Sequence, residues 1–199
     1  MKLLSTLALA TAFLFFSFSN SSCKSTAPII DPPSKEIVTT TVTEPVAKSN
    51  FIKPAGHTIP SVDVKTLEGK SVNIQDYVGK GKITVMSFWA TWCSPCKREL
   101  DAINEIYPDW QEAYDVELLA ITIDDARSMA KVPALIETKG WEYTILADSK
   151  RELQKALNFQ TVPQTFLLDA EGNIVYTHSG YNPGDEIELE EKIAALAEK

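Results

Sequence analysis

The chain is poor in cysteine and histidine, with three Cys and two His among 199 residues. An exported domain held together by disulfides usually carries more cysteines at wide spacings. A structural zinc site normally needs four Cys or His ligands. The sequence is therefore typical of neither class of protein, and we expect no metal site.

The chain also lacks an excess of positive charge. It has 19 Lys and Arg residues against 27 Asp and Glu residues, which gives a net charge of −8 at pH 7. Such a surface repels phosphate backbones, so we do not expect nucleic acid as a partner. The hydrophobic fraction of 44% is otherwise ordinary, and the length is that of one domain.

Residues 1–22 predict a secretion signal peptide. Lys2 is the only charge before Lys24, and an apolar run from Leu3 to Phe18 separates the two. That run is shorter than the ~20 apolar residues of a membrane-spanning helix, and small polar residues follow it. The alternative is a short anchor that is not cleaved. In both cases the folded part lies outside the cytoplasm.

Cys23 follows three small residues, Asn20, Ser21 and Ser22. This arrangement resembles the lipobox of bacterial lipoproteins, in which the Cys is lipidated and becomes the N-terminus. Asn20 departs from that pattern, which usually has Leu. The resemblance implies a lipid anchor at Cys23 that attaches the protein to a membrane. The alternative is an ordinary cleavage site that leaves a free thiol.

Residues 23–50 predict a flexible tether. They are rich in Thr, Ser and Pro, lack aromatic residues and show no sustained period of a strand or a helix. The alternative for the IVTTTV run is a real strand. The tether would join the anchor to a folded domain over residues 51–199.

The folded domain shows alternating strand and helix patterns. We expect strands over residues 61–68, 71–74, 82–88, 116–123, 143–146, 164–168 and 174–177. We expect helices from about 94, over 125–138 with an interruption near Pro133, over 149–157, and from about 184. Pro108 predicts a kink or break in the first helix, and Gly140 the end of the second. This order indicates a mixed sheet with helices on both faces.

Cys93 and Cys96 form a C-x-x-C pair. Haem attachment would need His at position 97, which is Lys, and zinc would need a second pair of ligands. A disulfide that closes so small a loop would restrict the unfolded chain very little. Redox chemistry remains, and the position between a buried strand and the start of a helix favours it.

The start of a helix makes the two sulfurs unequal. Free N–H groups and the positive end of the helix dipole stabilise a thiolate there. We expect Cys93 to be the more exposed and more acidic nucleophile. Cys96, one turn into the helix, would then attack the mixed disulfide and release the product. Pro95 lacks an N–H group and suits a first helical turn.

The segment FWATWCSPCKRE, residues 88–99, resembles the active-site segment of the thioredoxin superfamily. Within it, the TlpA/ResA type of exported or membrane-tethered thiol–disulfide reductase is the closest likeness. A second element is TVPQT, residues 161–165, followed by FLLDAEGNIV. The resemblance extends from about Ala55 to the C-terminus. It implies a thioredoxin-like α/β fold with an N-terminal hairpin and a strand–helix insert over residues 116–148.

The resemblance also assigns roles to site residues. Pro163 would be cis and face the Cys pair, and the backbone of Val162 would pair with an extended substrate segment. Trp92 would shape the rim that receives the substrate. Glu99 stands where the ResA type has an acidic residue thought to assist proton transfer at the buried sulfur. The alternative for Glu99 is a solvated helix glutamate.

One departure from thioredoxin concerns the proton acceptor. Thioredoxin has a buried Asp six residues before the first Cys, where this chain has Ser87, which cannot accept a proton near neutral pH. Glu99 is therefore the better candidate. Trp89 is expected in the core. His57, His178 and the acidic run over residues 185–191 are expected to be structural or solvent-exposed.

The sequence thus predicts a thiol–disulfide oxidoreductase of the bacterial cell envelope or periplasm. It would reduce disulfides of other envelope proteins, and apocytochrome c is one substrate class that the resemblance allows. An upstream thiol donor would supply electrons, and no cofactor is expected beyond the Cys93–Cys96 pair.

Three alternatives remain open. An oxidase or isomerase could use the same pair. A peroxiredoxin requires Thr or Ser three residues before its reactive Cys, where Ala90 stands relative to Cys93. A thioredoxin-like lipoprotein could bind Cu(I) through Cys93 and Cys96 alone.

Overall fold

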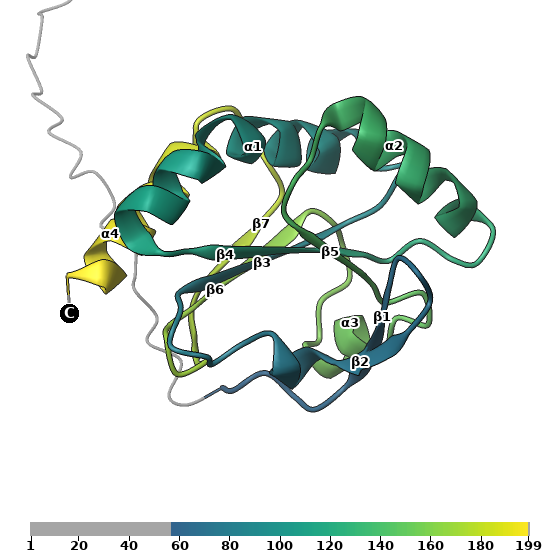
Figure 1. Cartoon of the computed structure of the whole chain (residues 1–199), viewed down its shortest axis with the longest axis horizontal. Helices are drawn as coiled ribbons and strands as arrows, with labels where there is room; N and C mark the ends of the chain where they lie inside the picture. The colour runs from purple at the N-terminus through teal and green to yellow at the C-terminus, as the bar shows by residue number, and fades with distance from the viewer. Residues whose placement is uncertain (1–56, 199) are drawn as a thin grey trace, which may run out of the picture. The chain divides into compact units, whose positions relative to one another are not determined.

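The computed structural model describes residues 57–198 (Figure 1). The predicted signal peptide, the tether and the lipidation site Cys23 lie outside these residues and stay predictions. Within residues 57–198, no helix has the length and apolar character needed to cross a membrane.

Within the described residues, seven strands form one mixed sheet in the order β2-β1-β5-β4-β3-β6-β7. The strands are β1 (Asp63–Thr66), β2 (Ser71–Asn73), β3 (Thr84–Trp89), β4 (Glu117–Thr122), β5 (Thr144–Ala147), β6 (Gln164–Leu168) and β7 (Ile174–Ser179). β3 pairs parallel with β4 and antiparallel with β6. The predicted hairpins are present as β1–β2 and β6–β7.

Helices cover both faces of the sheet, as predicted. They are α1 (Ser94–Tyr114), α2 (Val132–Lys139), α3 (Glu152–Ala156) and α4 (Asp185–Ala197), with 3₁₀ turns η1 (Ile74–Asp76) and η2 (Ser128–Lys131). Figure 1 shows α1, α2 and α4 above the sheet and α3 on the opposite side. α1 and α4 lie against each other, which matters for the site described below.

The central strands are buried along their length, which explains their continuous apolar sequences. Phe88 on β3 contacts the rings of Phe159 and Phe166, with centroids 4.7 Å and 5.8 Å away. Trp89, the last residue of β3, is fully buried, which confirms its predicted place in the core. The core thus fixes the end of β3, where the chain turns toward the cysteines.

Pro108 is expected to kink or break the first helix, and the helix is not broken there. α1 runs from Ser94 to Tyr114 with Pro108 inside it. Its neighbours Tyr107 and Trp110 are buried, and the Tyr107 hydroxyl accepts the backbone N–H of Leu118 at 3.2 Å. This packing offsets the ~3 kcal/mol that proline costs a helix interior.

The second half of the domain follows the prediction with shorter elements. The helix expected over residues 125–138 is divided into η2 and α2, and Pro133 stands in the first turn of α2. Gly140 ends α2 with φ 64°, a left-handed conformation that glycine adopts without strain. The helix expected over 149–157 is reduced to α3.

Candidate active site

The cysteine pair lies where β3 passes into α1. Cys93 is the N-cap of α1, and its backbone N–H donates to the carbonyl of Ala90 at 3.0 Å. Pro95 occupies the first turn, where its missing N–H costs nothing. Cys93 therefore stands at the helix entrance and Cys96 one turn inside, as the sequence predicts.

Cys93 and Cys96 form a disulfide, with sulfur atoms 2.01 Å apart. The backbone N–H of Cys96 donates to Sγ of Cys93 at 3.3 Å. An N–H group at a helix N-terminus stabilises negative charge, so this contact favours a thiolate on Cys93 once the disulfide is reduced.

The exposure of the two cysteines differs in the predicted order but by little. Cys93 is 5% exposed and Cys96 is 0% exposed. Cys93 is thus the more exposed of the two, as expected, although both side chains are buried. One reason for the burial of Cys93 is that the carbonyl oxygen of Val162 lies 3.7 Å from its Sγ.

The segment before β6 faces the cysteine pair although it is distant in sequence. The Val162–Pro163 peptide bond is cis, which confirms what the family resemblance implied. Pro163 is buried, and its carbonyl accepts the N–H of Gly180 at 2.9 Å. A substrate that reaches Cys93 must therefore pass beside Val162.

Trp92 projects into solvent beside the disulfide. Its side chain is 60% exposed, whereas nearly all other large hydrophobic side chains of the described residues are covered. An exposed aromatic next to a reactive group offers apolar contact area to a binding partner. This position fits the predicted rim, and the role itself stays a prediction.

Glu99 is buried, so the solvated alternative is wrong. It is 4% exposed and lies on the inner side of α1. Thr165 Oγ1 donates to Oε1 at 2.6 Å, and Ser87 Oγ donates to Oε2 at 3.3 Å. Burial raises the pKa of Glu99 to about 7, although both hydroxyl hydrogen bonds act to lower it.

Ser87 and Thr165 are functional candidates that the sequence did not indicate. They are direct partners across the β3–β6 pair, and Thr165 is in turn paired with His178 across β6–β7. Side chains of directly opposed residues project to the same face of a sheet. Three polar side chains therefore form a row under Glu99.

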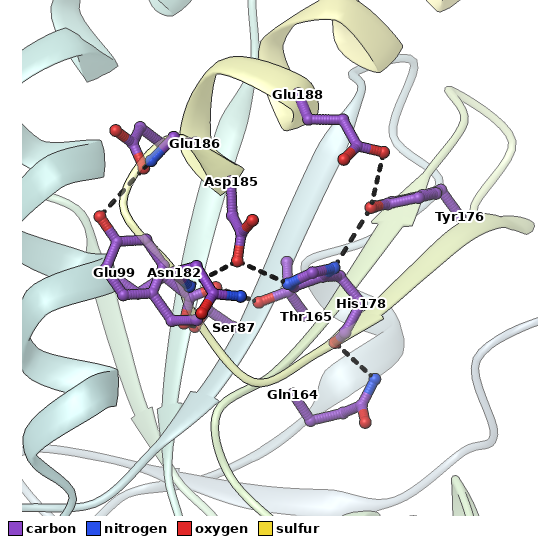
Figure 2. A network of polar contacts seen from close by, with 12 residues as sticks. Ser87, Glu99, Gln164, Thr165, Tyr176, His178, Asn182, Asp185, Glu186 and Glu188 are labelled. Carbon is purple, nitrogen blue, oxygen red and sulfur yellow. Dashed lines mark hydrogen bonds and ion pairs between the residues drawn. The ribbon is translucent and has the colours of Figure 1, made fainter. Parts of the chain in front are cut away.

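His178 and Asp185 are also closer to the site than expected. His178 Nε2 lies 3.0 Å from Asp185 Oδ2, and Figure 2 shows Asp185 at the start of α4 pointing toward the ring. Both line a cavity of about 10 Å³ together with Glu99. His57 is exposed and His178 is half-buried and hydrogen-bonded, in line with the expectation that the histidines are structural or solvent-exposed, whereas Asp185 is half-buried and not part of a fully solvated face.

A buried carboxylate holds the loop that leads to Cys93. Asp124, just after β4, is fully buried, and it accepts the backbone N–H of Thr91 at 2.8 Å and the Thr91 hydroxyl at 2.9 Å. Thr122 Oγ1 donates to the same carboxylate at 2.7 Å. Asp124 thereby fixes the residue two positions before Cys93. No local sequence pattern indicates this contact, because residues 91 and 124 lie on different strand ends.

Among residues 57–198, no group of three or more His, Cys, Asp or Glu residues is placed to hold a metal ion.

Comparison with known proteins places this site in context. The AhpC/TSA family model matches residues 55–177. The chain is 34% identical over 119 residues to the thiol-disulfide oxidoreductase ResA of Geobacillus thermodenitrificans, covering 60% of this chain and 66% of the relative. It is 32% identical over 133 residues to ResA of Geobacillus kaustophilus, covering 67% and 74%.

A solved structure supports the same grouping. An uncharacterized thioredoxin-like protein from Porphyromonas gingivalis shares 42% identity with this chain and superposes with a TM-score of 0.63. The match covers 70% of this chain and 92% of that one. The predicted thioredoxin-like fold and the resemblance to the ResA type are thus confirmed.

Proposed function

The chain belongs to the AhpC/TSA family, its ResA relatives are named thiol-disulfide oxidoreductases, and we propose that it reduces disulfides of proteins in the bacterial cell envelope. Thiol–disulfide exchange is the activity of this chain, and Cys93 and Cys96 are its redox centre. The direction, the partners and the role of each residue belong to the proposal.

The reaction begins from the reduced pair. The Cys93 thiolate attacks one sulfur of a substrate disulfide, which forms a Cys93–substrate disulfide and releases the other substrate sulfur as a thiolate. Cys96 then loses its proton and attacks Sγ of Cys93. The Cys93–Cys96 disulfide forms again, and the second substrate thiolate leaves. Two electrons pass from the protein to the substrate, and an upstream thiol donor restores the reduced pair.

Glu99 is the group that accepts the Cys96 proton in this proposal. It lies three residues after Cys96 on α1, a spacing that places two side chains next to each other on a helix. Because burial raises its pKa to about 7, the carboxyl can take up and release a proton near neutral pH. An exposed glutamate would remain ionised there and be a weaker base.

The substrate contacts lie beside Cys93. The carbonyl of Val162, which lies 3.7 Å from Sγ of Cys93, would accept an N–H from an extended segment of the partner, and Trp92 would provide apolar area. Unfolded or extended cysteine-containing segments fit such a surface, and apocytochrome c belongs to that class. The predicted signal peptide and the anchor at Cys23 would place the domain at the outer side of a membrane.

The observation that carries the proposal is the N–H of Cys96 directed at Sγ of Cys93 at the helix N-terminus. Its test is a Cys96→Ser variant, which cannot complete the second step. We expect mixed disulfides between Cys93 and envelope proteins to accumulate in envelope extracts, visible on non-reducing gels.

The matched control is the Cys93→Ser variant, which keeps one cysteine but should trap nothing, because Cys96 is fully buried. An empty trap for Cys96→Ser in both reducing and oxidising backgrounds would contradict the proposed function. Equal trapping by both variants would contradict the assignment of Cys93 as the nucleophile.

A peroxidase function is less well supported. The chemistry weighed above requires Thr or Ser three residues before the reactive Cys, and Ala90 stands there. Ala90 is fully buried, and its methyl group has no O–H that could donate a hydrogen bond to a peroxide.

A further inference from the structure

Glu99 has a closed side and a side that faces other polar groups. On the closed side its two oxygens accept from Ser87 and Thr165, and both hydroxyl residues are themselves buried. On the other side lies a cavity of about 10 Å³, roughly the volume that one water molecule requires. Charged groups can therefore approach this carboxyl only from the cavity side.

Among residues 57–198, His178 is the only one lining that cavity that can carry positive charge. It is the direct partner of Thr165 across β6–β7, and Thr165 is the residue whose hydroxyl donates to Glu99. Directly opposed residues have Cβ atoms roughly 5 Å apart. The sheet register thus holds the imidazole one side chain away from the carboxyl.

The imidazole is held in place through both of its nitrogens. Nε2 lies 3.0 Å from Asp185 Oδ2, and Nδ1 lies 3.4 Å from the hydroxyl of Tyr176. Tyr176 in turn donates to Glu188 at 3.4 Å, and Figure 2 shows it between His178 and Glu188. When the ring is charged, each N–H group has an acceptor within reach.

We propose that His178, clamped by Asp185 and Tyr176, is a positioning residue that uses its positive charge to keep the buried Glu99 able to ionise. The inference deepens the proposed function, because it concerns the residue assigned there as proton acceptor. It gives β7 and the start of α4 a role in the redox reaction.

The charges around the pair agree with this role. Burial raises the pKa of Glu99 most, and the hydrogen bonds from Thr165 and Ser87 lower it; of the two charged neighbours, His178 lowers this pKa and the carboxylate of Asp185 raises it. Burial raises the pKa of Tyr176 and of Tyr181 to about 12, which keeps both phenols neutral. Among the described residues, further titratable groups near Glu99 and His178 are Tyr143, Glu186 and Glu188, and Glu188 is paired with Lys192.

The test follows the titration of the Glu99 carboxyl by ¹³C NMR in the oxidised full chain. The Glu99→Gln variant assigns the resonance. We expect His178→Gln, which removes the charge, to raise the titration midpoint by about one pH unit. We expect His178→Lys, which restores a permanent charge, to keep the midpoint at or below that of the wild type. His57→Gln, which removes the other histidine, should leave it unchanged.

The outcomes separate this inference from the proposed function, because the carboxyl titrates whether or not Glu99 takes part in catalysis. An unchanged midpoint in His178→Gln would overturn the inference, as would an equal rise in His178→Gln and His178→Lys, which a merely structural role would give. If His178→Gln does not fold, His178→Lys alone decides the question. A titration midpoint of Glu99 in His178→Lys above that of the wild type would then overturn the inference.

Discussion

Glu99 is the residue at which burial and ionisation conflict most directly. Only 4% of it is exposed, and no cationic side chain is bonded to it among the described residues. A carboxyl in this position is more easily kept protonated than charged. Its pKa of about 7 in the folded chain lies above the 4.5 of an unperturbed glutamate. The folded state therefore binds a proton that the unfolded state has already lost between these two values.

That difference predicts how stability depends on pH. A raised folded pKa gives stability that is fully present below the unfolded pKa and is lost as the pH rises through the folded pKa. Between about pH 5 and pH 8, Glu99 should lower the free energy of unfolding by about 3 kcal/mol. Urea unfolding of the oxidised chain at several pH values measures this loss.

The Glu99→Gln variant should lack most of this pH dependence, because its amide does not titrate. Glu105→Gln serves as the control, since Glu105 is an exposed glutamate on the same helix and should leave the wild-type curve unchanged. A Glu99→Gln curve parallel to that of the wild type would show that Glu99 is already ionised in the folded chain at pH 5.

At the scale of elements, the site depends on the junction of β3, β4 and α1. The loop between β3 and α1 carries Thr91 and Trp92, which lie after the last strand residue, Trp89. Asp124, at the end of β4, supplies the missing acceptors for Thr91. Because β4 lies parallel beside β3, the carboxyl ends of both strands meet at this edge, and the carboxylate reaches the loop.

We predict that Asp124→Ala destabilises the chain by about 3 kcal/mol, because it leaves a backbone N–H and two hydroxyls without their buried acceptor. Thr91→Val should lower the free energy of unfolding by only about 1 kcal/mol, because the backbone N–H of residue 91 keeps its hydrogen bond to Asp124. Urea unfolding of both variants gives the comparison. Asp125→Ala is the control, since this neighbouring carboxylate is exposed and bonds to Arg127 and Ser128 of its own turn. Equal losses for Asp124→Ala and Asp125→Ala would refute the clamp.

At the scale of the whole molecule, local patterns predicted most of the fold. The buried strands and the amphipathic helices follow from runs and periods within about twenty residues, and the cysteine pair with the Val-Pro segment indicated the redox centre. Even the burial of Glu99 had a signal. It shares the inner stripe of α1 with Cys96, Leu100 and Ile103, at the spacing of one helix face.

What the sequence did not reveal depends on strand pairing over long distances. The row of Ser87, Thr165 and His178 exists because β3, β6 and β7 are neighbours in a fixed register. The predicted last strand ended at residue 177, whereas β7 continues to Ser179 and places Tyr176 and His178 on one face. The pairing of His178 with Asp185 further requires α4 to pack beside β7, which no local pattern specifies.

The predicted lipidation of Cys23, which precedes the described residues by 34 positions, would determine where the domain is held in the cell. A tether over residues 23–50 would span roughly 30 Å as a random coil, enough for the cysteine pair to reach partners away from the membrane surface. Acyl chains contribute roughly 0.8 kcal/mol for each buried CH₂ group, so several chains would anchor the protein firmly. Attachment and redox chemistry should then be separable.

We therefore predict that the wild-type chain partitions into the detergent phase after cell fractionation, whereas Cys23→Ser moves to the aqueous phase and keeps its exchange rate with a soluble disulfide peptide. The Cys93→Ser/Cys96→Ser double variant should show the reverse, remaining with the detergent without exchange activity. Mass spectrometry of the mature N-terminus identifies the acyl groups. An unmodified Cys23, or a Cys23→Ser chain that still enters the detergent phase with its first 22 residues intact, would instead favour an uncleaved N-terminal anchor.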